Sequence, residues 1–186
     1  MKRFFLLTLL LVLLTGCGRA AKEIERGMAL RSKLLNAVGC SFDAEITADY
    51  GDKLHTFAMT CRGNEKGDLN FTVTGPETIA GITGCISREA GKLTFEDTAL
   101  YFEMLVDGQV TPISAPWILL KTLRGGCLTS ACEEDGLLRL SMDDSYEEDA
   151  LHLDIWLNEA DQPVRGEILY KERRILSLSV TNFEIS

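Results

Sequence analysis

Residues 114–126 read SAPWILLKTLRGG, and this stretch decides the fold. The serine is of a type that caps helices, the proline suits a first turn, and the closing glycine pair is typical of a helix end. Trp117, Leu120 and Leu123 recur at helical spacing, and the two residues after Trp117 widen the apolar arc. A helix this apolar must be largely buried. We therefore expect it to lie against another layer of the protein.

Short stretches with a period of two surround this helix on both sides. In Leu151–Asn158, apolar side chains alternate with polar or outward ones, which is typical of a strand with one buried face. Gly81 and Gly84 interrupt another such stretch and indicate the bend of a curved sheet. We expect one mainly β domain with a few helices, in which a single antiparallel curved sheet holds the helix at about 114–124 on its concave face. The stretches that predict strands are 40–48, 57–61, 68–74, 79–88, 93–95, 100–104, 127–133, 137–142, 150–157, 164–170 and 175–183.

The N-terminus has the proportions of an export signal. Lys2 and Arg3 precede an apolar run of about 11 residues, whereas a helix that spans a membrane needs roughly 20. Residues 14–17, Leu-Thr-Gly-Cys, resemble the lipobox of bacterial lipoproteins. This resemblance implies that residues 1–16 are a lipoprotein signal peptide, and that Cys17 becomes the first residue and carries a diacylglycerol. The alternative is ordinary cleavage nearby, with Cys17 unmodified.

A lipidated Cys17 would place the domain on the outer face of a cell membrane. Two or three acyl chains, such as palmitate, hold a protein there, whereas a single chain is marginal. We expect residues 17–21 to form the lipidated tether. Residues 22–38 then predict a helix with an apolar stripe that packs on its own domain, because a membrane-lying helix would carry more Lys and Arg together with Trp or Phe. The stripe comprises Ile24, Met28, Leu30, Leu34 and Leu35.

The charge balance narrows the class of partner. The chain has 28 acidic and 19 basic side chains, for a net charge of −9. Loss of Lys2 and Arg3 with the signal makes the mature domain more acidic still. Nucleic-acid binding depends on basic patches, so we expect no nucleic-acid partner. Anionic headgroups repel such a surface, and we expect the lipid to do the anchoring.

Five cysteines remain besides Cys17, and an odd number cannot pair completely within one chain. An exported protein can form disulfides. A turn at 49–52 would set Cys40 directly opposite Cys61, within disulfide reach, and we predict that bond. Cys85 is expected to point outward, so an unpaired thiol could join two chains in a homodimer.

Cys127 and Cys132 allow two readings. If residues 127–132 form one extended strand, their Cα atoms lie about 16 Å apart and cannot be bridged. If residues 128–131 turn, the two can pair. A Cys85–Cys127 bond or an interchain bond also remains open.

Catalytic and metal motifs are absent from the sequence. It contains no Gly-x-Ser-x-Gly, HExxH, P-loop or dinucleotide pattern, and neither His55 nor His152 has a recognisable partner motif. The Cys127/Cys132 pair lacks the second pair that zinc sites use, and Asp143–Asp149 lacks the ligand spacing of an EF-hand loop. We expect no enzymatic activity, no metal and no cofactor.

The order of these features resembles a known superfamily. A helix leads into paired strands, followed by GPETIAGITG at 75–84, GKLTF at 91–95, the apolar helix, and closing hairpins with Pro163 in the last but one. Over residues 22–186 this pattern resembles the LolA/LolB-like lipoprotein carriers and, among them, the GerS-like lipid-anchored lipoproteins of clostridia. The resemblance implies an incomplete barrel of about 11 antiparallel strands around an apolar cavity, with helices as its lid. From the strand and helix pattern, the residues that would face the concave side suit either an adaptable apolar pocket or an ordinary packed core. They are Phe42, Ile46, Phe57, Met59, Phe71, Val73, Ile82, Trp117 and Leu120.

Two functions fit this pattern. The first is a membrane-anchored, non-enzymatic binding module of a Gram-positive cell envelope, which engages an envelope protein and serves in spore or germination processes. The second is a carrier that binds an acyl chain or another apolar lipid in the half-barrel cavity, with the helix at 114–124 as its lid. The carriers themselves are soluble, whereas Cys17 would fasten this chain to a membrane. An envelope enzyme is the third and weakest hypothesis.

Overall fold

The computed structural model describes residues 17–186 apart from residues 50, 52, 89, 96–97, 103–104 and 107–108. The predicted signal peptide, residues 1–16, therefore lies outside the described residues. Two helices, α2 (Cys17–Asn36) and α3 (Ala115–Gly125), accompany an 11-stranded antiparallel sheet and a two-stranded ribbon, β7 (Leu105–Val106) with β8 (Gln109–Val110). The strands of the sheet are β1 (Gly39–Asp49), β2 (Leu54–Asn64), β3 (Leu69–Gly75), β4 (Thr83–Ile86), β5 (Gly91–Phe95), β6 (Thr98–Phe102), β9 (Cys127–Glu134), β10 (Leu137–Asp143), β11 (His152–Leu157), β12 (Pro163–Tyr170) and β13 (Arg173–Ile185).

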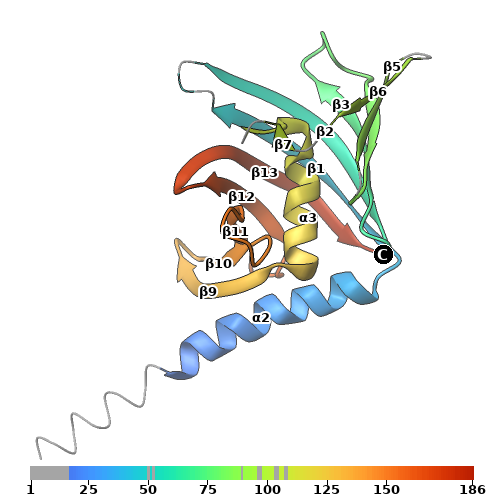
Figure 1. Cartoon of the computed structure of the whole chain (residues 1–186). Helices are drawn as coiled ribbons and strands as arrows, with labels where there is room; N and C mark the ends of the chain where they lie inside the picture. The colour runs from blue at the N-terminus through green and yellow to red at the C-terminus, as the bar shows by residue number, and fades with distance from the viewer. Residues whose placement is uncertain are drawn as a thin grey trace, which may run out of the picture.

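The sheet consists of two meanders joined through the two ends of the chain. Its strand order is β6-β5-β4-β3-β2-β1-β13-β12-β11-β10-β9, so β6 and β9 form its edges. Every neighbouring pair is a sequential hairpin except β1 with β13, which pair from Cys40–Ile185 to Ala48–Leu176. Figure 1 shows the sheet curving around α3, with α2 crossing below. The predicted single, curved, antiparallel and incomplete barrel is confirmed.

The strand predictions differ from the structure at β4 and at β5. The stretch predicted at 79–88 shortens to β4, because residues 76–81 form a turn in which Gly81 has a φ of 90°. Gly84 lies inside β4, where a Cβ would stand 2.6 Å from the carbonyl oxygen of Lys92 on the next strand. Strand β5 begins at Gly91, two residues before the stretch predicted at 93–95.

The predicted register of the first hairpin is wrong by two positions. β1 and β2 pair from Gly39–Asn64 to Asp49–Leu54, which places Cys40 opposite Gly63 and Cys61 opposite Phe42. The connecting loop comprises residues 50–53 rather than 49–52. Both strands still bury the expected face, because a shift of two residues preserves the alternation.

Helix α3 fills the concave face of the sheet. Eight of its 11 residues are buried, in agreement with the prediction from its apolar arc. Gly63 on β2 allows the helix to approach closely, since a Cβ there would lie 2.5 Å from Leu120 Cδ2. On the opposite half of the sheet, a Cβ on Gly166 of β12 would lie 3.5 Å from Leu119 Cδ1. One helix therefore packs against both meanders.

Helix α2 buries only part of the apolar stripe predicted for it. It packs on β9, β10 and α3, and it turns Leu30 and Leu34 into the core. The other three residues of the predicted stripe, Ile24, Met28 and Leu35, are 42, 45 and 53% exposed. The helix begins at Cys17, so the residues expected to form a tether belong to it. Among the described residues, no helix combines the length and apolarity that crossing a membrane requires.

Replacing Leu120 by Ala tests the packing of α3. Leu120 is 1% exposed, and removing a buried leucine side chain costs about 2–5 kcal/mol of unfolding free energy through lost burial and the cavity left behind. The matched control is Leu100→Ala in edge strand β6, where Leu100 is 61% exposed, with an expected change within about 0.5 kcal/mol. Chemical denaturation measures both. Equal effects would contradict the packing described for α3.

Candidate functional site

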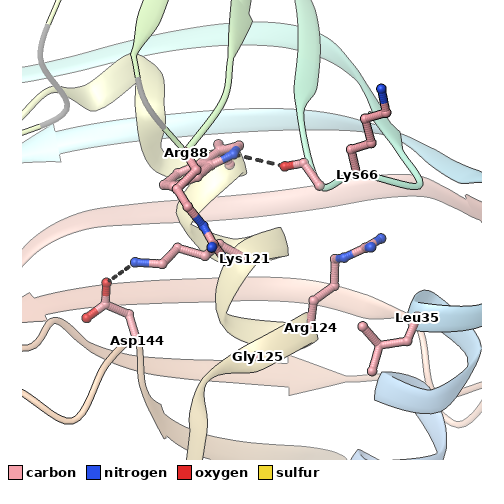
Figure 2. Close-up of a pocket in the computed structure, with 9 residues that line it drawn as sticks. Leu35, Lys66, Arg88, Lys121, Arg124, Gly125 and Asp144 are labelled. Atoms are coloured by element: carbon pink, nitrogen blue, oxygen red, sulfur yellow. Dashed lines mark hydrogen bonds and ion pairs between the residues drawn. The ribbon is translucent and has the colours of Figure 1, made fainter.

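A basic pocket opens where the C-terminal ends of the two helices meet the turn between β2 and β3. Its volume is about 360 Å³. Four cationic side chains and a single carboxylate line it, although the chain as a whole carries an excess of acid. Figure 2 shows these side chains around the last turns of α3. The lining residues are Leu35, Lys66, Gly67, Arg88, Trp117, Lys121, Arg124, Gly125 and Asp144.

Lys121 and Trp117 form the inner wall of the pocket. The ammonium of Lys121 lies 2.8 Å from Asp144 Oδ2 and 5.6 Å from the centre of the Trp117 ring. The indole Nε1 of Trp117 donates a hydrogen bond of 3.0 Å to the carbonyl of Gly67. Asp144 also accepts a 2.8 Å bond from the amide of Leu151. These contacts hold α3 to both meanders and fix the position of one cation.

Two arginines bind the carbonyls at the C-terminal ends of the helices. Arg31 of α2 donates to the carbonyls of Leu123 and Gly126 at 3.0 and 2.5 Å. Arg124 of α3 donates to the carbonyl of Leu34 at 3.0 Å and to that of Glu65 at 2.6 Å. Unpaired carbonyls at a helix end carry partial negative charge, which cations stabilise. Each helix thus supplies the arginine for the other's C-terminal end.

Lys66 and Arg88 have no such structural role. Lys66 belongs to the β2–β3 turn, and Arg88 follows β4. Both are exposed, and within the described part of the chain neither makes an ion pair. Figure 2 shows the ammonium of Lys121 directed at Asp144. Asp144 is the single carboxylate among the lining residues, so the pocket retains uncompensated positive charge.

The sequence analysis missed this pocket because its residues come from five separate segments. Lys66, Arg88 and Asp144 each occupy an ordinary polar turn, which by itself predicts only a solvated loop. One feature of the sequence could have indicated the pocket. Lys121 and Arg124 are the only charged residues of α3, and the rest of this helix is apolar except for one threonine. A cation at such a place needs a nearby carboxylate, carbonyl or anion.

The structure places the predicted cavity residues in the core. Phe57 and Ile82 are partly buried and pack against the core, and the other seven are buried. Trp117 and Leu120 project from α3, and the remainder come from β1, β2, β3 and the turn before β4. Trp117 alone among the nine lines the basic pocket. Whether these residues bind a ligand stays a prediction.

The five cysteines described with their side chains are free thiols in the structure. The shifted register removes the direct pairing predicted for Cys40 and Cys61, although both point into the core. Cys127 and Cys132 lie on the single strand β9, which is the arrangement expected to prevent a bond between them. Cys85 and Cys127 are partly exposed, and Cys132 is exposed. Burial raises the pKa of the Cys40 and Cys61 thiols.

The outer face of the sheet carries a polar network around Asp154. This buried carboxylate accepts bonds from Arg139 Nη2 at 2.7 Å and from Ser141 Oγ at 2.6 Å. Burial alone would raise the pKa of Asp154, but the two hydrogen bonds together with the charges of Arg139 and His152 outweigh it, and the pKa is lowered. His152 contacts Asp143 through Nδ1 at 2.8 Å. The geometry supports cross-strand stabilisation of β10 and β11.

Trp156 lies in the same outer face and is buried without belonging to the main core. The guanidinium of Arg165 lies 4.3 Å and that of Arg139 5.5 Å from the centre of its ring. Cation–π contacts of this kind stabilise an aromatic ring on a solvated face. The sequence correctly put Trp156 on this face of β11.

Comparison with solved structures finds chains of similar fold at low sequence identity. A DUF1329 family protein from Desulfovibrio piger is similar at a TM-score of 0.51 and 8% identity, over 90% of this chain and 93% of that one. A LolA superfamily protein from Nitrosomonas europaea gives 0.45 and 7%, over 86% and 93%. A chain from the complex of the CwlD amidase with the GerS lipoprotein of Clostridioides difficile gives 0.42 and 12%, over 84% and 92%. No family model and no curated protein matches the chain. Identities this low show the fold alone.

Thiol titration distinguishes the cysteines. We expect a thiol reagent to label Cys132 first, because it is exposed, and to label Cys40 and Cys61 only after unfolding, because they are buried with raised pKa values. Mass spectrometry of labelled peptides reads this order without reductant. If Cys40 and Cys61 stay unlabelled even in denaturant, they form a disulfide and the free-thiol arrangement is wrong.

Asp154→Asn should lower stability by about 1.5–3 kcal/mol near neutral pH, the range for hydrogen bonds to a charged group. The pKa of Asp154 is lower in the folded than in the unfolded protein, so its contribution is complete above the unfolded value of about 3.9 and is lost as the pH falls through the folded value. The difference between the two proteins should therefore shrink below about pH 4. Urea titrations at several pH values measure it. The control is Asp149→Asn at an exposed turn; a gap that persists in acid would contradict this role for Asp154.

Proposed function

We propose that the chain is a lipid-anchored, non-enzymatic binding module of the bacterial cell envelope. The observation that carries this proposal is the position of α3, which fills the concave face on which an acyl carrier would hold its cargo. Eight buried residues of α3 occupy this space, including two of the predicted cavity residues, Trp117 and Leu120. A module of this kind binds its partner through surface features of the domain. The basic pocket is the most distinctive of those described.

The N-terminus supports the anchoring part of the proposal. The lipobox-like sequence at residues 14–17 ends at Cys17, and α2 begins there without an intervening linker. Cys17 acyl chains would therefore hold the first turn of α2 near the membrane surface and present the domain on the outer face. A Gram-positive envelope, with a spore or germination role, is the setting we propose from the sequence resemblance.

The carrier function remains the second candidate, and it makes a distinct structural demand. Trp117 and Leu120 line the interior of the sheet together with Phe42, Ile46 and Phe71, so an acyl chain could enter only if α3 moved outward. Such movement would break the Lys121–Asp144 ion pair and the bond from Trp117 to Gly67. A carrier should thus contain noncovalent lipid and should lose those contacts when loaded.

Substituting Cys17 tests the proposal in the producing cell. The parent chain should incorporate a clickable palmitate analogue and sediment with membranes, whereas Cys17→Ala should do neither, because no other residue can receive the diacylglycerol. Cys132→Ala, which removes an exposed cysteine elsewhere, is the matched control and should behave as the parent. Label that persists in Cys17→Ala would contradict anchoring at this residue.

A second measurement on the purified chain distinguishes the binding module from the carrier. Mild denaturation releases noncovalent lipid but leaves a thioether-linked anchor in place. Mass spectrometry of the released fraction should find no stoichiometric fatty acid or phospholipid if α3 keeps the concave face filled. One released lipid per chain would make the protein a carrier and overturn the binding-module proposal.

A further inference from the structure

We propose that the basic pocket binds a phosphate group. The pocket lies between α2, α3, the turn after β2 and the segments after β4 and β10. The inference rests on the proposed function in one respect: the anchored module would meet its ligand at the cell envelope. Binding itself depends only on the folded domain and not on the anchor.

The charge distribution is the first argument. The whole chain has more acidic than basic side chains, yet the pocket lining contains Lys66, Arg88, Lys121 and Arg124 against Asp144 alone. Asp144 already pairs with Lys121, and Arg124 already donates to the carbonyls of α2 and the β2–β3 turn. Lys66 and Arg88 make no ion pair with another described residue. An anionic ligand would provide an opposite charge for both.

The geometry is the second argument. Trp117 and Asp144 hold the Lys121 ammonium in place, so part of the ordering that a ligand would require already exists in the folded protein. Arg88 and Lys121 both line this pocket, so two donors of positive charge border one space. A guanidinium matches the oxygens of phosphate in a bidentate manner, and an ammonium adds a point charge. The pocket volume of about 360 Å³ lies within the range of roughly 300–1,000 Å³ for small-molecule sites.

The exposed apolar residues of α2 bear on the source of the phosphate. Leu35 borders the pocket, and Met28 and Ile24 continue from it along the helix at spacings of seven and four residues. All three are exposed. A phospholipid would place its headgroup among the cations and its acyl chains along these side chains. A soluble phosphate compound would use the cations alone.

Isothermal titration of the full chain, purified in non-ionic detergent, tests the proposal. The probes are glycerol 3-phosphate, uncharged glycerol, and dihexanoyl-phosphatidylglycerol, which carries the same headgroup chemistry with short acyl chains. We expect both phosphate probes to bind with an affinity that falls as salt is added, and glycerol not to bind. If dihexanoyl-phosphatidylglycerol binds more tightly than glycerol 3-phosphate, the source of the phosphate is a lipid headgroup. If the two bind equally, the source is a soluble phosphate compound.

Three variants locate the binding. Arg88→Gln should weaken it about tenfold, the effect of losing one charge-assisted contact. Arg173→Gln makes the same change at an exposed position at the start of β13 and should stay within about twofold of the parent. Asp144→Asn removes the negative charge of the pocket but keeps an amide oxygen that can accept a hydrogen bond from Lys121, so it should tighten binding. The opposite direction of the Asp144 and Arg88 effects separates ligand binding from general destabilisation.

The proposal is overturned if neither phosphate probe binds the parent chain, or if Arg88→Gln and Arg173→Gln weaken binding equally. Its failure is distinguishable from failure of the proposed function. If the chain binds phosphate but takes up no lipid label, the proposed lipid anchor is wrong and the phosphate site stands. If the chain takes up the label but binds no phosphate, the phosphate site is wrong and the anchor stands.

Discussion

The burial of α3 against the concave face of the sheet is the contact on which the rest of the structure depends. The two meanders share a single strand pair, β1 with β13. Without the helix, the apolar concave face of this wide sheet would be exposed to water. Leu120 packs at Gly63 on one half of the sheet and Leu119 packs at Gly166 on the other, so one short helix covers the apolar face of both halves. Burying apolar area on both halves stabilises the curvature as well as the helix, which would be marginal alone.

The same packing produces the basic pocket. Because α3 ends beside the C-terminal end of α2, two sets of unpaired carbonyls come together, and Arg31 and Arg124 bind them. Lys121, at the polar edge of α3, then reaches Asp144. The turn after β2 and the segment after β4 add Lys66 and Arg88 to the same place. A concentration of positive charge on an acidic protein thus follows from where the helix sits, and it gives the domain a site that its overall charge would not suggest.

Much of this fold could be predicted from the sequence, and the errors share one cause. The alternation in Leu151–Leu157 and the apolar arc of α3 are local patterns, and both elements formed as expected. The first hairpin kept its buried face but shifted by two residues, because alternation alone cannot distinguish registers that differ by two. Leu30 and Leu34 of α2 are buried while Ile24 and Met28 are exposed, since the broad apolar arc exceeds the surface that β9, β10 and α3 can cover.

The sequence by itself determined the succession of the strands along the chain, the class of the fold and the apolar helix. Those features depend on residues that are neighbours in the chain, so periodicity and composition record them. Only the tertiary structure decided the β1–β13 pairing, the hairpin register, the face of α2 that is buried and the meeting of Lys66, Arg88, Lys121 and Asp144. These depend on residues far apart in sequence that come together only when apolar surface is buried, and no local pattern carries that information.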